Sequence, residues 1–359
     1  GSEKFDSELK AKAVVWLCKK TNKSILNLTE SDYNENSLSE LLIHQSAYDL
    51  NLEVFNRIDR TITGWPGGKP NIDDRNRPER ANPANKRVLI FSPHPDDDVI
   101  SMGGTFDRLV SQGHDVHVAY QTSGNIAVNN SEVLKFLEVF CETSKDVKKK
   151  YQSLMNILKK SNEILDNKEI RKIASFIREK ESLAATRFIG IPDCNVHFLR
   201  LPFYETGTVK KSQPSKLDFD IISNIITKIK PHQIYGAGDL ADPHGTHKVC
   251  LDILFDVLKS IKKKSFMKNC WVWLYRGAWH EWEVYEIDMS IPMSPFQVLK
   301  KRKAIFYHQS QKDNVMFQGD DNREFWVRTE DRNRAIAKKF HDLGMSDYSA
   351  IETFKRYHF

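Results

Sequence analysis

Four potentially charged side chains occupy five positions between two apolar runs. In the stretch RVLIFSPHPDDDVISMGGT, residues 87–105, His94 is followed by Asp96, Asp97 and Asp98. Three adjacent carboxylates repel one another, so either full solvation or a cation must offset their charge. The two prolines that flank the histidine stiffen the loop and remove two backbone donors, and a fully solvated loop would not require that. The stretch therefore predicts a bound cation.

A second histidine motif lies about 150 positions later. The segment DLADPHGTHK, residues 239–248, contains His244 and His247, which are one turn apart if a helix begins there. A catalytic zinc site uses three protein ligands and leaves a position open for water. The two motifs together supply three such ligands and leave one carboxylate and one imidazole for general acid–base work. Either motif alone is common at protein surfaces and helix starts, so the assignment depends on their occurring together.

Both motifs follow apolar segments that are typical of buried strands. The alternation of such segments with helical patterns predicts an α/β fold: a Rossmann-like, doubly wound, mostly parallel sheet with helices on both faces. Ligands of such sheets bind at the carboxyl ends of the strands, so His94 and His244 should share that edge. The expected strands are 87–92, 115–122, 195–200, 233–237 and 271–275, and the expected helical regions are 100–112, 131–189, 216–229, 246–262 and 294–308.

The first motif resembles a known family signature. Phe91 to Asp98, with the glycine pair 103–104 after it, is similar to the (A/S)-H-P-D-D-E signature of the LmbE-like, or PIG-L, zinc de-N-acetylases. This family hydrolyses the acetamido group of N-acetylglucosamine conjugates. The segments 178–191 and 196–202 resemble its R-x-x-E…A-A…L-G segment and the strand that follows. The chain also resembles the C-terminal part of bacterial proteins whose N-terminal half is similar to glucosamine-6-phosphate deaminase.

The resemblance implies roles for five residues. His94, Asp97 and His247 would bind one Zn²⁺ per chain. Asp96 would be the general base that takes a proton from the attacking water. His244 would be the charged group near the scissile carbonyl.

The same resemblance gives expectations for Asp98 and Arg178, and this chain departs from the family pattern at Asp98 and at the second motif. Asp98 stands where the family usually has Glu. We expect it to orient a ligand or the loop without binding the metal. Arg178, in the R-x-x-E segment, is a candidate for substrate binding. The second motif, commonly H-P-D-H, reads His244-Gly245-Thr246-His247 here, so it lacks the intervening acid.

The expected function is a zinc-dependent amidohydrolase that removes the N-acetyl group from an N-acetylglucosamine-type sugar or conjugate and releases acetate. Two alternatives remain open at this point. One is a hydrolase of the same fold with a different amide substrate. The other is a metal-stabilised module that binds a sugar phosphate without turnover. Acetate release that a chelator abolishes would separate the enzyme from the binding module.

The chain divides into three predicted parts. Residues 1–60 form a helical N-terminal segment, which would be the end of a truncated upstream domain, since the opening Gly1-Ser2 is typical of cloning. Residues 61–86, rich in glycine and proline, form a linker. Residues 87–359 form the LmbE/PIG-L-like deacetylase domain, in which an aromatic-rich C-terminal region that includes Trp326 is expected to shape the pocket.

Composition narrows the class of protein. The 359 residues carry a mild net charge of +6, and the lysine runs lack interleaved aromatic residues, so no nucleic-acid partner is expected. No run approaches the roughly 20 apolar residues that span a membrane. The five cysteines form no C-x-x-C pair, which favours a reducing compartment. We therefore expect a bacterial cytoplasmic enzyme.

Overall fold

The central element of the computed structural model is a seven-stranded sheet, formed within the described residues, with the order β3-β2-β1-β4-β5-β7-β6. Strands β1 to β5 pair in parallel, whereas β7 pairs antiparallel with both β5 and β6. The strands are β1 (Arg87–Ser92), β2 (Asp115–Tyr120), β3 (Val196–Phe198), β4 (Gln233–Ala237), β5 (Trp271–Tyr275), β6 (Met289–Met293) and β7 (Ala350–Tyr357). The structure describes residues 6–69, 83–160, 167–206, 211–241, 245–277, 279–312 and 323–359.

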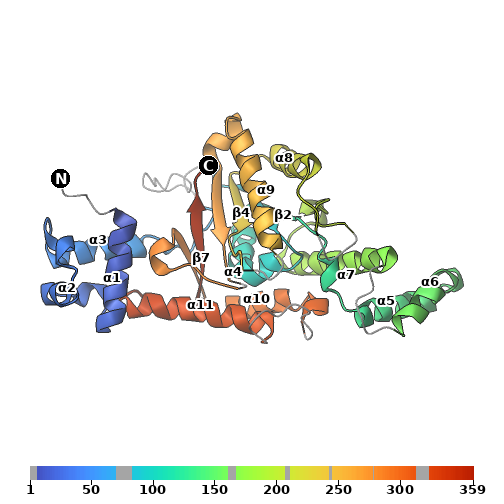
Figure 1. Ribbon diagram of the computed structural model, residues 1–359, viewed down its shortest axis with the longest axis horizontal. Helices are drawn as coiled ribbons and strands as arrows, with labels where there is room; N and C mark the ends of the chain where they lie inside the picture. The colour runs from blue at the N-terminus through green and yellow to red at the C-terminus, as the bar shows by residue number, and fades with distance from the viewer. Residues whose placement is uncertain are drawn as a thin grey trace.

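Helices cover both faces of the sheet, because the central strands are apolar on both sides. Leu89 and Phe91 of β1 join the core beneath α8 (Lys216–Ile229) and α9 (Thr246–Ile261). Val88 and Ile90 join the core beneath α4 (Asp97–Ser111) and α7 (Lys168–Ile189), on the other face (Figure 1). The predicted α/β fold, a mostly parallel sheet with helices on both faces, is confirmed. The remaining helices of residues 87–359 are α5 (Asn130–Thr143), α6 (Lys145–Leu158), α10 (Pro295–Ile305) and α11 (Phe325–Asp342). Of these, α5 and α6 pack with α7 in a separate apolar cluster and lie away from the sheet (Figure 1).

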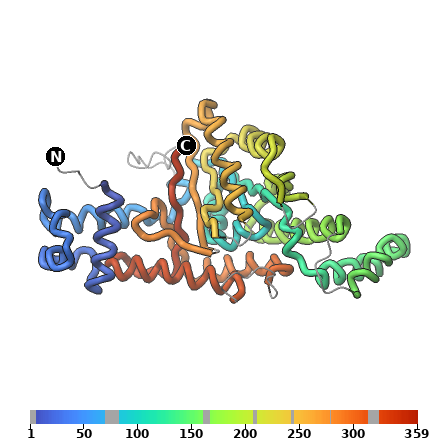
Figure 2. Tube along the Cα trace, in the orientation of Figure 1, coloured from blue at the N-terminus to red at the C-terminus, as the bar shows by residue number. Residues whose placement is uncertain are grey.

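The N-terminal helices α1 (Ser7–Thr21), α2 (Glu30–Glu35) and α3 (Ala47–Asp59) pack at one end of the molecule, beside the C-terminal end of α11 (Figure 2). The backbone N–H of Ile25 donates to the carbonyl of Leu343 at 3.2 Å. The chain then runs along the edge of the sheet, where the Thr63 N–H donates to the Ser290 carbonyl of β6 at 2.9 Å. The predicted N-terminal helices are therefore present, and the boundaries at residues 60 and 86 stay predictions.

Three details differ from the sequence-based expectation. The helix expected from residue 100 begins at Asp97, so two carboxylates lie in its first turn, where the helix dipole favours negative charge. The helical region 131–189 is three helices, α5, α6 and α7. Strands β6 and β7 and helix α11 were not expected. None of the described helices has the length and apolar character needed to cross a membrane.

Candidate functional site

The site lies where β1 and β4, which pair in parallel at the centre of the sheet, both end. Strand order reverses here: β2 flanks β1 on one side and β4 flanks it on the other. At such a point the loops after the two strands diverge and leave a crevice. The loop after β1 contains His94 and the three aspartates, and the segment after β4 leads to His247 in the first turn of α9.

Hydrogen bonds within the β1–α4 loop, and one from the residue Thr122 after β2, fix the conformation of this loop. Ser92 Oγ donates to the His94 carbonyl at 2.6 Å and accepts the Asp98 N–H at 3.1 Å. Thr122 Oγ1 donates to the Pro93 carbonyl at 2.7 Å. The loop therefore holds its side chains in one arrangement instead of leaving them solvated.

Among the described residues, one group of three has the composition and spacing of a metal site. The ligand atoms of His94, Asp97 and His247 all lie within 4.8 Å of one another. Asp97 Oδ2 is 3.2 Å from His94 Nδ1 and 3.1 Å from His247 Nε2. Although burial acts to raise it, the imidazoles of His247 and His94 hold the pKa of Asp97 well below its usual range.

A hydrogen bond on the far side of the His247 ring fixes its orientation. His247 Nδ1 lies 2.8 Å from the backbone carbonyl of Asp239. Because a carbonyl only accepts, Nδ1 must carry the proton, and Nε2 faces Asp97. This is the arrangement that metal-binding histidines adopt. Two imidazoles and one carboxylate are also a donor set that catalytic zinc sites use, so the residues fit a zinc ion.

Asp96 lies next to this group and is held by a buried arginine. Arg178 Nη2 is 3.1 Å from Asp96 Oδ1, and the same guanidinium donates to the carbonyls of Pro95 and, at 3.3 Å, Gly124. Burial, with the nearby charges of Asp97 and Asp98, raises the pKa of Asp96 to about 8, and Arg178 opposes this rise.

The backbone at Asp96 is also unusual. Its φ is +130°, a conformation that residues with a Cβ rarely adopt. Strain of this kind persists only where surrounding contacts impose it and is common at functional sites. Here the contacts of Arg178 with both Pro95 and Asp96 supply that constraint.

Asp98 points away from this group. Its Oδ2 accepts the hydroxyl of Tyr120 at 2.9 Å, and the residue is fully buried. Burial raises the pKa of Asp98 to about 6, and the Tyr120 hydrogen bond opposes the rise. Asp98 thus joins the loop to the end of β2, and its role in orienting the loop stays a prediction.

The structure thus brings together five of the seven residues expected at the site: His94, Asp96, Asp97, Arg178 and His247. Asp98 lies beside them and is hydrogen-bonded to Tyr120 of the sheet. His244 lies outside the described residues. The next residue, Gly245, has φ +65° and precedes α9 directly, so the backbone turns sharply between the two histidines of the second motif.

The chain is similar to a known protein family and to several known proteins. The family model described as GlcNAc-PI de-N-acetylase, PIG-L, matches residues 89–258. Over these residues the chain resembles the PIG-L family. A glucosamine-6-phosphate deaminase-like protein of Bacteroides thetaiotaomicron is 50% identical over 98% of this chain and 55% of its own length, so the chain spans about half of that relative.

Two deacetylases resemble parts of the chain. Diacetylchitobiose deacetylase of Thermococcus kodakarensis is 42% identical over 48 residues, which are 13% of this chain and 18% of that protein. The structure of N,N'-diacetylchitobiose deacetylase from Pyrococcus horikoshii has a TM-score of 0.51 and 18% identity over 79% of this chain and 87% of that one. That structural likeness indicates a shared fold.

Several residues that support the candidate site were not identified from the sequence. Tyr120 and Asp239 act on Asp98 and His247 through single hydrogen bonds. Arg178, a candidate for substrate binding, contacts the β1–α4 loop and Gly124. His308 lies beyond the matched PIG-L residues and close to Asp96. A lone histidine or tyrosine has no spacing signal, so only the three-dimensional arrangement identifies these residues.

Proposed function

We propose that this protein is a zinc-dependent de-N-acetylase that acts on an N-acetylglucosamine-type sugar or conjugate and releases acetate and a free amine. His94, Asp97 and His247 would bind one zinc ion. The observation that carries the proposal is the convergence of these ligand atoms within 4.8 Å, with a buried carboxylate, Asp96, directly beside them.

Zinc at this position would lower the pKa of a bound water and polarise the amide carbonyl. Asp96 is proposed as the general base that accepts the proton of the attacking water. Burial, which raises its pKa, makes it a stronger base than an exposed aspartate. A divalent cation nearby would lower that pKa again, so the carboxylate would be ionised in the loaded protein. Arg178 positions Asp96 through their 3.1 Å ion pair.

His244 is proposed as the charged group near the scissile carbonyl. The proposal rests on its place in the sequence, one residue before the turn that starts α9. We also propose that residues 87–359 act as one catalytic domain, because β5, β6 and β7 complete the sheet that begins with β1.

The substrate class is supported by the names of related proteins. The matching family is described as a GlcNAc-PI de-N-acetylase, and the Thermococcus kodakarensis relative is a diacetylchitobiose deacetylase. Both names denote removal of an acetyl group from an N-acetylglucosamine unit. We therefore propose the same chemical class of substrate for this chain.

The test measures acetate released from N-acetylglucosamine, N-acetylglucosamine 6-phosphate and N,N'-diacetylchitobiose. The protein is used as purified, after treatment with a chelator, and after zinc is restored. We expect release that chelation abolishes and zinc restores, with about one zinc per chain by elemental analysis. Sugar binding without acetate release from any of the three would contradict the proposal and favour a binding module.

A further inference from the structure

The backbone of Asp239 sets the orientation of one proposed zinc ligand. Its carbonyl oxygen lies 2.8 Å from Nδ1 of His247, the ring nitrogen on the side away from Asp97. Because the peptide group is planar and stiff, the direction of this carbonyl follows from the position of the residue that carries it. Whatever holds Asp239 in place therefore also holds the His247 ring.

The side chain of Asp239 is anchored on a different part of the chain. Its Oδ2 accepts two backbone N–H groups, that of Trp279 at 2.6 Å and that of His280 at 2.8 Å. The residue is 1% exposed, so water does not compete for these hydrogen bonds. A carboxylate that accepts backbone N–H groups forms stronger hydrogen bonds than a neutral acceptor does. The carboxylate thus joins the loop after β4 to the segment after β5.

The preceding residue, Gly238, contacts the same segment. Its N–H donates to the Tyr275 carbonyl at 2.8 Å, and its carbonyl accepts Nε–H of Arg276 at 3.0 Å. A Cβ at Gly238 would lie 2.8 Å from Cζ2 of Trp282, so the lack of a side chain lets this indole lie close to the backbone. The two residues that lead from β4 toward the second motif are therefore both held by the chain after β5.

These contacts connect the proposed metal site to residues beyond 89–258, the range that the family model matches. The connection has few steps. The N–H groups of Trp279 and His280 hold the Asp239 carboxylate, and the Asp239 carbonyl holds the His247 imidazole. A hydrogen bond of this kind fixes the ring of a ligating histidine and makes it a more basic ligand.

We propose that Asp239 is a positioning residue for the zinc ligand His247, and that its carboxylate acts by anchoring the loop after β4 on the segment after β5. Asp239 acts only through the imidazole and touches neither metal nor substrate. This inference rests on the proposed function, because it requires zinc at this site, and it deepens that function by assigning a share of zinc binding to the segment after β5.

The first test measures zinc affinity without substrate, by competition with a chromogenic chelator. Asp239→Ala should bind zinc about 10- to 100-fold more weakly, the usual cost of losing a group that orients a ligand. Asp239→Asn keeps an oxygen that can accept both N–H groups and should recover most of this affinity. Asp252→Ala is the matched control, since it removes an exposed carboxylate of α9 that pairs with Lys248, and it should leave zinc affinity unchanged. Equal affinities for Asp239→Ala and the unmodified protein would overturn the proposal.

Cobalt substitution separates an effect on the ligand from a general loss of stability. The visible absorption bands of Co²⁺ respond to the geometry of its ligands. At saturating cobalt, Asp239→Ala should have bands that differ in position and intensity from those of the unmodified protein, whereas Asp239→Asn should keep them. If the spectrum of Asp239→Ala is the same as that of the unmodified protein, Asp239 does not position the ligand.

The last measurement needs no metal. In metal-free protein with ¹⁵N-labelled histidine, the Nδ1–H signal of His247 is assigned by its loss in His247→Gln, and its exchange with water is followed. Asp239→Ala should accelerate this exchange about tenfold, because the buried hydrogen bond opens more often, and an unchanged rate would overturn the proposal. If the unmodified protein binds no zinc, the proposed function fails, and the exchange rate still decides whether Asp239 holds His247.

Discussion

The three adjacent aspartates of the β1–α4 loop have three different environments. Asp97 lies between two imidazoles, Asp96 lies against a guanidinium, and Asp98 accepts a tyrosine hydroxyl. Each carboxylate thus has its own partner, which offsets the repulsion that the sequence DDD implies. The roles proposed for Asp96 and Asp97 differ accordingly and can be separated by substitution.

We expect Asp96→Asn to retain zinc and to lose about 10²–10⁴-fold in turnover, because the amide keeps the shape of the side chain but cannot accept a proton. Asp97→Asn should instead bind zinc more weakly, and added zinc should restore part of its activity. Elemental analysis and acetate release are measured for both variants side by side. Loss of zinc from Asp96→Asn together with full zinc in Asp97→Asn would show that the two roles are reversed.

Among the individual site residues, those that lie close together along the chain could be predicted from the sequence. His94 and the aspartates form one motif, and an α/β fold brings the second motif to the same sheet edge. The contact between Arg178 and Asp96 joins positions 82 residues apart, and its detail depends on how α7 packs. The place of His308 depends on Ser310 and Glu181, which no local pattern in the sequence indicates.

Helix α4 has an irregular turn beside the buried ion pair of Glu352 and Lys301. Met102 has non-helical dihedral angles, and the N–H groups of Gly104 and Thr105 donate to Glu352 of β7, at 3.0 and 2.6 Å. Glu352 is in turn 2.8 Å from Lys301 Nζ, and both residues are buried. The kink therefore follows from helix N–H groups that bond to a carboxylate instead of the preceding turn.

Glu352→Ala should destabilise the protein by about 3–5 kcal/mol, because it leaves the buried Lys301 charge without its partner. The double variant Glu352→Gln with Lys301→Met should recover a large part of this loss. Urea unfolding of the two variants measures both effects. A single substitution that costs less than about 1 kcal/mol would contradict the assignment of this pair as the anchor of α4.

The glycines of α4 allow this close packing. A Cβ at Gly103 would lie 3.0 Å from Lys301 Cγ, and one at Gly104 would lie 2.9 Å from Met293 Cγ and overlap the sulfur of that residue. Gly104→Val should therefore lower stability by about 1–3 kcal/mol through overpacking. Ser111→Ala, near the exposed end of the same helix, is the control. Equal melting temperatures for the two variants would mean that the glycine is not required.

Helices and strands could be predicted from the sequence where their apolar residues form a continuous or periodic pattern, as in β1, β4 and α9. Strand β6 was missed because Pro292 interrupts its sequence, and proline disfavours a strand unless it lies at a sheet edge. The structure places β6 at that edge. Strand β7 was missed because it pairs antiparallel with β5 and β6, which end 75 and 57 positions before its start, so its partners are not evident from local sequence.

Across the whole molecule, several histidines are kept neutral by their surroundings. Burial lowers the pKa of His114, His197 and His232 to about 4, and that of His308 to about 3. His114 and His232 also accept backbone N–H groups, of Lys86 at 3.1 Å and Arg87 at 3.0 Å, which a protonated nitrogen cannot do.

These histidines should therefore contribute less to stability as pH decreases below about 6.5, the ordinary histidine pKa. Below that value they bind protons in the unfolded chain but not in the folded protein, which lowers the free energy of unfolding. The carboxyl groups of Asp96 and Asp98, whose pKa values burial raises, act in the opposite direction. Melting temperatures between pH 7.5 and 5 measure the effect. The double variant His114→Asn with His232→Asn should lose less stability on acidification than the unmodified protein, and equal changes in melting temperature for the two proteins would contradict this account.

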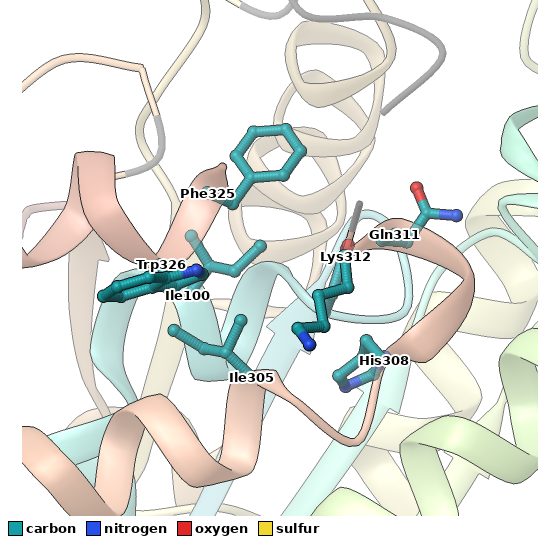
Figure 3. Close-up of a pocket in the computed structure, with 8 residues that line it drawn as sticks. Ile100, Ile305, His308, Gln311, Lys312, Phe325 and Trp326 are labelled. Atoms are coloured by element: carbon teal, nitrogen blue, oxygen red, sulfur yellow. The ribbon is translucent and has the colours of Figure 1, made fainter. Parts of the chain in front are cut away.

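Helix α11 connects two distant parts of the molecule. Its 18 residues span about 27 Å at 1.5 Å per residue. Phe325 and Trp326 at its start line the small pocket beside Asp96 (Figure 3), and Leu343, just past its end, accepts the N–H of Ile25. The helix also packs against β7 and α4, so it joins the N-terminal helices and the residues at its own start to the same sheet.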